Sequence, residues 1–342
     1  MKPIKIGIVG FGKMGILHAG ILNALPNCEV TAICEKEPLM RKLASKLAPK
    51  IHYFETPFDM VSSEQLDAVY VTTPISGHRY IVEDIARASN RLGLFIEKPL
   101  AKSVDDGQSI IDAASKFAST CMVGFQKRFL PQFTRAQKLL RLGVLGETTV
   151  FKGYSYLESG PSKKGGWRFK KGEGGALLDL GPHIIDMIIW YFGTPTSVTA
   201  VESSLSSKYV EDAVQIEFGF QSGISGRVEV SWRKEGYRLP YTGLEISGSN
   251  GTIKVSDDFL ELDLLCEIRG LAKSGRTILV RPQITGGVPF LLGDPEYCRE
   301  DQSFLYGLRS GKTVTPNFDD GLEVNKVIQL AHASAGGSIQ IA

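Results

Sequence analysis

The sequence predicts two domains: a doubly wound α/β domain with a parallel sheet in residues 1–125, and an α+β domain with an open, largely antiparallel sheet in residues 126–342. Two patterns indicate this. The first third of the chain alternates short apolar runs with segments of helical spacing, whereas later segments are apolar at every second residue. A chain of 342 residues is also long for one core, so two domains are expected.

The first domain is predicted from five strand-like runs, which are almost continuously apolar, as strands covered on both faces are. These runs are Ile4–Val9, Val30–Cys34, Ala68–Thr72, Leu94–Ile96 and Cys121–Phe125. Segments with helical spacing lie between them, at Met14–Leu25, Pro38–Leu47 and Tyr80–Ala88. Strands that alternate with helices indicate a parallel, doubly wound sheet.

The second domain is predicted from alternating strands. Val214–Phe220 and Val228–Trp232 place apolar residues at every second position, so one sheet face is buried and the other is polar. The polar face would either meet a partner subunit, in a homodimer or homotetramer, or be solvated. Asn250-Gly251 lies between strand-like runs and predicts a hairpin. The helical segment Gly321–Ala335 can pack back on the first domain.

Composition narrows the class of protein. A net charge of +2, from 39 basic and 37 acidic residues, gives no large positive field for nucleic acid or anionic lipid. The 5 cysteines are never spaced as C-x-x-C, which argues against a disulfide framework or a metal site and favours reduced thiols. We find neither a signal-like N-terminus nor an apolar run long enough to span a membrane. We therefore expect a cytoplasmic protein.

A glycine-rich loop carries the first functional signal. Gly10-Phe11-Gly12-Lys13-Met14-Gly15 matches G-x-G-x-x-G between a predicted strand and a predicted helix, the context of a dinucleotide loop. Gly10 would permit the tight turn, Gly12 the close approach of a pyrophosphate, and Gly15 the close packing of helix on strand. The helix start would offer free N–H groups to the phosphates. The alternative is a glycine turn of some other α/β protein.

The end of the second strand bears on the choice of dinucleotide. Glu35 can accept hydrogen bonds from the adenosine ribose hydroxyls, which favours NAD. Lys36 beside it could contact a 2′-phosphate, so NADP stays possible.

Two segments contain candidate catalytic residues. Glu97-Lys98-Pro99 ends a strand, where ligands of open α/β sheets bind, so Lys98 is expected beside the nicotinamide; the alternative is a surface ion pair. Asp179 and His183 are four residues apart and would share a helix face, an arrangement suited to proton transfer. Pro182 implies either a kinked helix or a helix starting near Gly181. The alternative for this pair is a core histidine with a helix-capping aspartate.

In these residues the chain resembles the glucose–fructose oxidoreductase and inositol dehydrogenase (Gfo/Idh/MocA-like) family, over nearly its whole length. The resemblance rests on the glycine loop, Glu97-Lys98-Pro99 and the segment from Gly174 to Asp186. It also rests on smaller motifs in the same order: Thr72-Thr73-Pro74 with His78, Gly124–Phe129, Trp167-Arg168 and Gly248–Gly251.

The resemblance implies roles for these residues. Lys98 would bond the reacting oxygen and assist proton transfer, His183 would be the general acid/base, and Asp179 would orient His183 or the substrate. Other residues would line the cofactor or the substrate: Thr72, Thr73, Pro74, His78 and Glu97 on the cofactor side, Gln126 and Arg128 where cofactor and substrate meet, and Trp167-Arg168 near the nicotinamide. The first-helix histidine, His18, is expected to pack or cap rather than to bind a ligand.

The expected function is hydride transfer between a nicotinamide and a secondary alcohol or ketone of a sugar, polyol or nucleotide sugar. Three alternatives remain: an NAD-dependent glycosidase that uses transient oxidation, a non-catalytic NAD(P)-binding regulatory protein, and a reductase of small carbonyl compounds or tetrapyrroles. The loop Tyr156–Lys171 could cover the substrate, and its Lys163-Lys164 would suit an anionic one. A solvated basic loop is the alternative.

Overall fold

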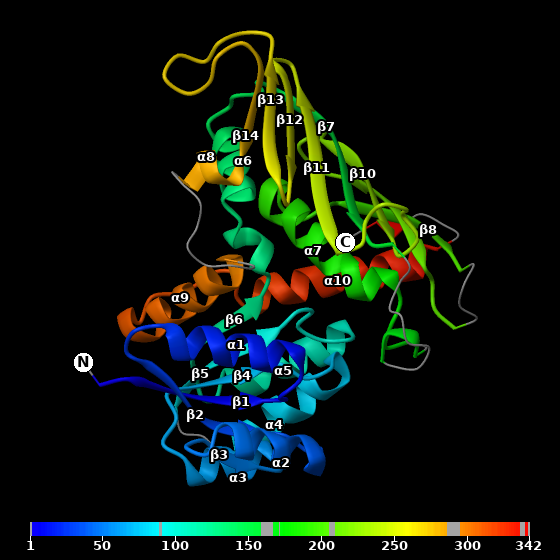
Figure 1. Ribbon diagram of the computed structural model, residues 1–342. Helices are drawn as coiled ribbons and strands as arrows, with labels where there is room; N and C mark the ends of the chain where they lie inside the picture. Colours follow the sequence, from blue (N-terminus) through cyan, green and yellow to red (C-terminus); the bar gives the residue numbers. More distant parts are fainter. Residues whose placement is uncertain are drawn as a thin grey trace. The chain divides into compact units, whose positions relative to one another are not determined.

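The computed structural model describes residues 2–88, 91–158, 167–170, 172–204, 209–285, 295–335 and 339–340 (Figure 1). The chain forms two compact units, Met1–Gln126 with Glu296–Asn325, and Lys127–Pro295 with Lys326–Ala342. The sequence-based division placed residues 296–325 in the second domain. In the structure they pack with the first unit instead. The basic pair Lys163-Lys164 lies outside the described residues.

The first unit contains a six-stranded parallel sheet in the order β3-β2-β1-β4-β5-β6. This is a doubly wound parallel sheet, as expected. The strands are β1 (Ile4–Val9), β2 (Cys28–Cys34), β3 (His52–Phe54), β4 (Ala68–Val71), β5 (Leu92–Glu97) and β6 (Ala118–Gly124). The helices are α1 (Lys13–Ala24), α2 (Pro38–Leu47), α3 (Pro57–Ser63), α4 (His78–Ala88), α5 (Val104–Ala114), α9 (Pro295–Ser310) and the first part of α10 (Phe318–Ser334), with the 3-10 turn η1 (Ile75–Gly77).

Aromatic packing explains why α9 belongs to this unit. Tyr70 of β4 and Phe95 of β5 stack at 4.5 Å between ring centroids, and Phe304 of α9 lies edge-on to both. All three side chains are fully buried. A Cβ on Gly93 of β5 would lie 2.3 Å from Leu308, so the missing side chain leaves the space that α9 fills. The burial of these three aromatic rings stabilises the contact between α9 and the sheet, although α9 is far from β4 and β5 in the sequence.

The second unit contains a nine-stranded sheet in the order β14-β13-β12-β11-β7-β10-β9-β8-β15. The strands are β7 (Thr148–Tyr156), β8 (Ser197–Ser203), β9 (Ala213–Gly219), β10 (Ser225–Ser231), β11 (Tyr241–Gly248), β12 (Gly251–Ser256), β13 (Phe259–Leu264), β14 (Gly275–Val280) and β15 (Ile339–Gln340). Among these neighbours only β10 and β7 pair in parallel. The expectation of a largely antiparallel sheet is therefore confirmed.

Helices cover one face of this sheet. They are α6 (Pro131–Arg141), α7 (Ala176–Phe192) and α8 (Arg281–Thr285), and the 3-10 turns η2 (Gln126–Phe129) and η3 (Trp167–Phe169) lie near them in sequence. Phe192 of α7 stacks on Phe151 of β7 at 4.8 Å. The predicted hairpin joins β11 to β12 through Ser249 and Asn250. No helix in the described part of the chain is long and apolar enough to cross a membrane.

Candidate active site

The glycine loop adopts the geometry that a dinucleotide loop needs. Gly10 has a φ of +89°, a value that side chains other than hydrogen disfavour, and its N–H donates to Cys34 O at 2.8 Å. A Cβ on Gly15 would lie 2.1 Å from Gly10 O, so α1 packs against the loop only because residue 15 is glycine. Two of the three glycines are therefore required by the protein's own packing.

The third glycine leaves open space, which fits a bound phosphate. A Cβ on Gly12 would have no neighbour within 4 Å among the described atoms. Gly12 is the N-cap of α1, no side chain caps that helix start, and its first turn carries no acidic residue. The first-turn N–H groups and the partial positive charge of the helix end thus suit a pyrophosphate. The open space at Gly12 and the uncapped start of α1 therefore fit the pyrophosphate of NAD.

Glu35 closes the loop from the end of β2. Its Oε2 accepts the N–H of Phe11 at 2.8 Å and its Oε1 accepts the N–H of Glu37 at 2.9 Å. The half-buried carboxylate keeps further acceptor capacity for ribose hydroxyls, while Lys36 is exposed. Arg41, which the sequence analysis missed, donates to the backbone oxygens of Glu35 and Lys36. Arg41 therefore helps to fix the end of β2.

The segment after β4 packs on the glycine loop. Thr72 Oγ1 donates to Gly10 O at 2.7 Å, and the methyl group of Thr73 would lie 2.6 Å from a Cβ on Gly10. Thr73 Oγ1 is buried with no hydrogen-bond partner among the described residues, and Pro74 is exposed. A buried hydroxyl of this kind is a group that a ligand can satisfy.

His78 joins two loops at this edge of the sheet. Its Nε2 lies 3.0 Å from Thr73 O and its Nδ1 lies 3.1 Å from Leu100 O, just beyond Pro99. Burial lowers the pKa of His78 against the opposing effect of these carbonyls, so the ring is neutral and donates to one carbonyl at a time. The family resemblance predicts His78 at the cofactor. Its structural contact is with the loops after β4 and β5.

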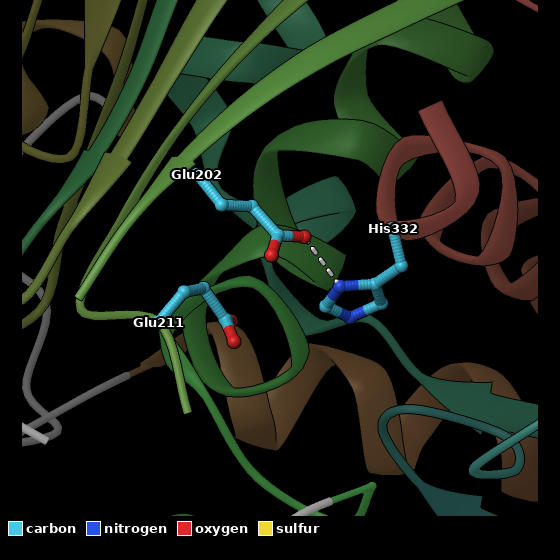
Figure 2. A group of neighbouring side chains, drawn as sticks. All are labelled: Glu202, Glu211 and His332. Carbon is cyan, nitrogen blue, oxygen red and sulfur yellow. Dashed lines mark hydrogen bonds and ion pairs between the residues drawn. The ribbon is translucent and has the colours of Figure 1, made fainter. Parts of the chain in front are cut away.

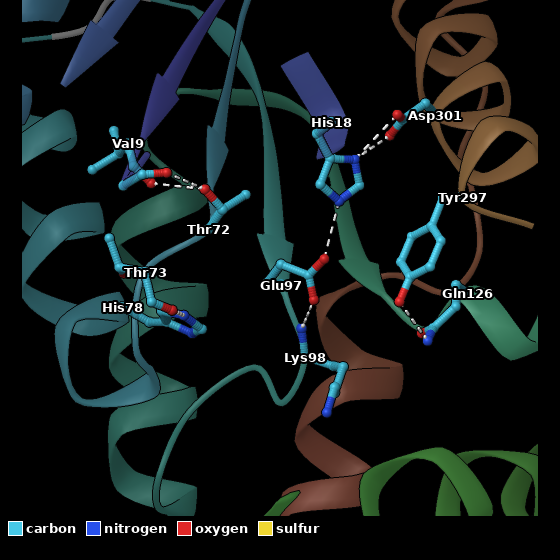
Figure 3. Close-up of polar contacts among 11 residues, drawn as sticks. Val9, His18, Thr72, Thr73, His78, Glu97, Lys98, Gln126, Tyr297 and Asp301 are labelled. Atoms are coloured by element: carbon cyan, nitrogen blue, oxygen red, sulfur yellow. Dashed lines mark hydrogen bonds and ion pairs between the residues drawn. The ribbon is translucent and has the colours of Figure 1, made fainter. Parts of the chain in front are cut away.

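Glu97 and Lys98 lie at the carboxyl end of β5, as expected (Figure 3). Glu97 is buried, and its Oε2 accepts the N–H of Lys98 at 3.1 Å while its Oε1 lies 3.0 Å from His18 Nε2. Lys98 itself is half-buried. Gln126 is buried nearby in the same unit, where its Nε2 donates to Tyr297 OH at 3.0 Å. The polar residues Glu97, Lys98 and Gln126 thus lie at the predicted edge of the sheet, and hydrogen bonds fix Glu97 and Gln126 there.

In the second unit, α7 carries Asp179 and His183 on an unbroken helix from Ala176 to Phe192 that includes Pro182. The helix thus begins before Gly181 and continues through Pro182, so the alternative of a helix that starts near Gly181 is wrong. Both side chains are 6% exposed. Arg168 Nε donates to Asp179 Oδ1 at 2.9 Å and Trp232 Nε1 to Oδ2 at 3.2 Å, so the carboxylate is held from two sides.

The surroundings of Asp179 also order Trp167-Arg168. The Arg168 guanidinium lies 4.9 Å from the centre of the Trp167 ring, in cation–π geometry. The start of α7 is fixed by Glu211, whose Oε1 accepts the N–H of Leu177 at 2.9 Å. Asp179 is thus positioned by a charge, an indole and a fixed helix start.

Arg128 is bound into the core of the second unit. Its guanidinium forms a bidentate ion pair with Asp186, with Nε 2.9 Å from Oδ2 and Nη2 2.6 Å from Oδ1. Arg128 is 7% exposed and Asp186 is fully buried. The family resemblance predicts Arg128 where cofactor and substrate meet. The structure gives its charge a partner inside the unit, a role that the sequence did not indicate.

One group of side chains in the second unit has metal-ligand chemistry, although the sequence indicated no metal site. Ligand atoms of Glu202, Glu211 and His332 all lie within 4.8 Å of one another (Figure 2). His332 Nδ1 is 2.7 Å from Glu202 Oε1, and Glu211 accepts the N–H of Leu177. These contacts account for the group as an ion pair beside a helix cap, so we assign it no ion.

The contacts of three polar residues around Glu97 and Asp179 could not be read from the sequence. His18 follows Gly15 at helical spacing and lies on the buried face of α1, a signal that indicated packing but gave no partner. Trp232 stood in an alternating strand, where its indole N–H could not be assigned. Asp301 gave no signal, because its partner His18 is 283 residues away.

Comparison with known proteins agrees with this geometry. The family description "Oxidoreductase family, NAD-binding Rossmann fold" matches residues 4–125, and "GFO/IDH/MocA C-terminal domain" matches residues 133–254. The scyllo-inositol 2-dehydrogenase (NAD(+)) of Bacillus subtilis is 25% identical over 91% of this chain and 87% of its own length. The inositol 2-dehydrogenase of Rhizobium meliloti is 25% identical over 99% of this chain and 98% of its own.

Solved structures show the same fold. Levoglucosan dehydrogenase in complex with NADH superposes with a TM-score of 0.89 at 24% identity, and 100% of each chain is covered. One of the two family descriptions matches within each domain, in the order that the structure shows. The predicted resemblance, the Rossmann-type first domain and the NAD-dependent oxidoreductase class are thereby confirmed, and the chain belongs to the GFO/IDH/MocA oxidoreductase family.

Proposed function

We propose that this protein transfers a hydride between a nicotinamide and a secondary alcohol or ketone carbon of a sugar, polyol or nucleotide sugar. The observation that carries the proposal is the placement of Lys98 at the carboxyl end of β5, in the same unit as an uncapped dinucleotide loop. Ligands of open α/β sheets bind at that edge. NAD, when bound, supplies the hydride acceptor, and the protein supplies orientation and proton transfer.

The proposed roles follow from donor chemistry. Lys98 would donate a hydrogen bond to the reacting oxygen, and His183 would take the hydroxyl proton during oxidation. Asp179 would fix the position of His183 or a substrate hydroxyl, because its carboxylate is itself held by Arg168 and Trp232. Trp167-Arg168 would contact the nicotinamide end of the cofactor, and Gln126 the substrate side. These assignments rest on the family resemblance together with the local geometry of each unit.

Relatives suggest the substrate class to test. Their names include scyllo-inositol, D-apiose and levoglucosan dehydrogenases. One structural neighbour, at a TM-score of 0.87 and 20% identity, was solved with NADH and UDP-GlcNAcA. These compounds are cyclic or nucleotide-linked polyols with secondary hydroxyl groups. We propose a neutral cyclic polyol as the first candidate, with a nucleotide sugar as the second.

We also propose that the protein is cytoplasmic and forms a homodimer or homotetramer through the open face of the second sheet. On that face the half-buried rings of Tyr154 and Tyr241 stack at 6.3 Å. Val201 of β8 is 71% exposed. Aromatic and apolar groups on a broad sheet face are typical of an interface. Light scattering of the wild type and of a Val201→Lys variant would test this.

The function is tested by titrating the purified protein with NADH and NADPH, followed through nicotinamide fluorescence. NAD⁺ reduction is then measured with scyllo-inositol, D-apiose, levoglucosan and UDP-GlcNAcA as probes. A Lys98→Ala variant should bind NADH normally and lose about 10²- to 10⁴-fold in turnover, the usual contribution of acid–base help. Lys102, an exposed lysine 3.6 Å from Asp106, provides the matched control, since Lys102→Ala should keep full turnover.

Three outcomes would contradict the proposal. A Lys98→Ala variant with full turnover would remove the catalytic role of Lys98. Cofactor that stays bound without net redox change while a glycoside is cleaved would indicate the glycosidase. Cofactor binding with no turnover of any probe would indicate a regulatory protein.

A further inference from the structure

A buried histidine joins the first helix to the strand end that carries Lys98. His18 Nδ1 lies 2.9 Å from Asp301 Oδ1 of α9, and its Nε2 lies 3.0 Å from Glu97 Oε1 of β5 (Figure 3). The three residues come from segments separated by 79 and 283 positions in the sequence. The contact therefore exists only in the folded first unit.

The histidine carries a charge in this position. Both ring nitrogens face carboxylate oxygens, so both donate only if the ring is an imidazolium. Burial would lower the pKa of His18, but the charges and hydrogen bonds of Asp301 and Glu97 outweigh it and hold the pKa well above its usual value. His18 and Asp301 are fully buried, and Glu97 is 7% exposed. Charge-assisted bonds in a dry environment fix geometry tightly.

The remaining neighbours of the ring leave it little freedom. The rings of Phe95, Tyr70 and Tyr297 lie 5.1, 5.3 and 6.0 Å from it between centroids. Burial, together with the neighbouring carboxylate of Glu97, raises the pKa of the Glu300 carboxyl group well above its usual value. The imidazolium is thus surrounded by aromatic rings and hydrogen-bonded at both nitrogens.

Glu97 transmits this arrangement to the candidate catalytic segment. While Oε1 bonds His18, Oε2 accepts the backbone N–H of Lys98 at 3.1 Å. The carboxylate also lies against Gly124 at the end of β6, where a Cβ would be 3.3 Å from Oε2. One carboxylate therefore connects the imidazolium, the start of the loop after β5 and the neighbouring strand end.

From this geometry we infer that His18, clamped by Asp301, is a positioning residue that holds Glu97 and thereby sets the backbone of Lys98 for the reaction. The inference deepens the proposed function and rests on it, since it assigns His18 no contact with substrate or cofactor. The competing explanation is that the cluster only stabilises the fold. The two differ in one respect: a positioning effect disappears when Lys98 is absent, and a stability effect does not.

A double-mutant cycle separates the two explanations. Turnover with NAD⁺ and the best polyol probe is measured for the wild type, His18→Gln, Lys98→Ala and the double variant. We expect His18→Gln to lower kcat about tenfold or more at nearly unchanged KM for the probe, because misplacing a catalytic group by about 1 Å can cost about 10²-fold. In the Lys98→Ala background the same substitution should change kcat less than about twofold.

Controls keep the result interpretable. NADH affinity and Tm are measured for each variant, and His52→Gln, an exposed histidine paired with Glu64, should leave kcat unchanged. If His18→Gln does not fold, Asp301→Asn replaces it in both backgrounds and should show the same dependence on Lys98. An equal loss of kcat with and without Lys98 would overturn the positioning role alone. Full turnover of Lys98→Ala would instead overturn the proposed function, on which this role depends.

Discussion

A methyl group added at Gly12 of the glycine loop should weaken ligand binding without disturbing the packing of the protein itself. Gly12 has φ −78° and ψ −161°, values that any residue adopts. A Cβ there meets no atom within 4 Å in the part of the chain that the structure describes. Gly12→Ala should therefore fold normally. Its Tm should stay the same or rise slightly, because alanine reduces the entropy of the unfolded chain.

The same methyl group would occupy the space through which the pyrophosphate approaches the backbone. Losing one charge-assisted hydrogen bond to a phosphate costs about 1.5–3 kcal/mol, which corresponds to roughly 10- to 150-fold weaker NADH binding. The matched control is Gly20→Ala in the same helix, where a Cβ also meets no atom within 4 Å among the described residues. Gly20→Ala should bind NADH with wild-type affinity.

The assay is a fluorescence titration of NADH against the wild type and both variants, with Tm measured in parallel. Gly15→Ala extends the test, since its Cβ would lie 2.1 Å from Gly10 O. That variant should lose stability, whereas Gly12→Ala should lose only affinity. Equal NADH affinity for Gly12→Ala and Gly20→Ala would refute the placement of the pyrophosphate at this loop.

Three further predictions concern charge. Arg128→Met should lower the free energy of unfolding by about 3–5 kcal/mol because it removes the guanidinium that pairs with the buried Asp186 carboxylate, and adding Asp186→Leu should recover most of the loss in chemical denaturation; recovery of none would contradict the ion-pair account. Glu35→Gln should weaken NADH binding and improve NADPH binding in titration, since a negative charge beside the 2′-phosphate is removed; an unchanged ratio would speak against its ribose role. Burial lowers the pKa of His332, but the hydrogen bond to Glu202 and the neighbouring carboxylate charges together outweigh this effect and raise that pKa above its usual value. The contribution of the His332–Glu202 pair to stability is therefore fully present below pH 6.5 and is lost as the pH rises through the raised pKa of His332. His332→Gln should flatten that part of the Tm–pH curve, and an unflattened curve would exclude the pair as its cause.

The fold was predictable where local pattern and global packing agree. The continuous apolar runs of β1, β2 and β4 and the alternation in β9 and β10 predicted their sheets, because burial on two faces or one leaves these patterns in sequence. The Asn250-Gly251 signal also predicted the β11–β12 hairpin. The short strand β3 and the helices α3 and α5 were not identified, since their apolar residues are few or mixed with polar ones.

The site was predictable as a set of motifs and not as a set of contacts. The sequence indicated Lys98, but nothing in it pairs Asp301 with His18 across 283 residues. The return of α9 to the first unit was equally hidden, because it depends on Phe304 meeting aromatic rings of β4 and β5. For the same reason Arg128 was expected at a ligand, while its bidentate contact with Asp186 is visible only once the chain is folded. Long-range pairing leaves no local pattern.

The central claim, net hydride transfer from a polyol carbon to NAD⁺, is tested most directly with a substrate deuterated at its carbinol carbons. The purified enzyme is incubated with NAD⁺ and deuterated levoglucosan or scyllo-inositol, and the nicotinamide product is analysed by mass spectrometry and NMR. Our account predicts that NADH accumulates in step with the ketone and carries one deuterium at C4. Turnover that consumes substrate without accumulating labelled NADH, or NADH that carries no deuterium, would contradict it.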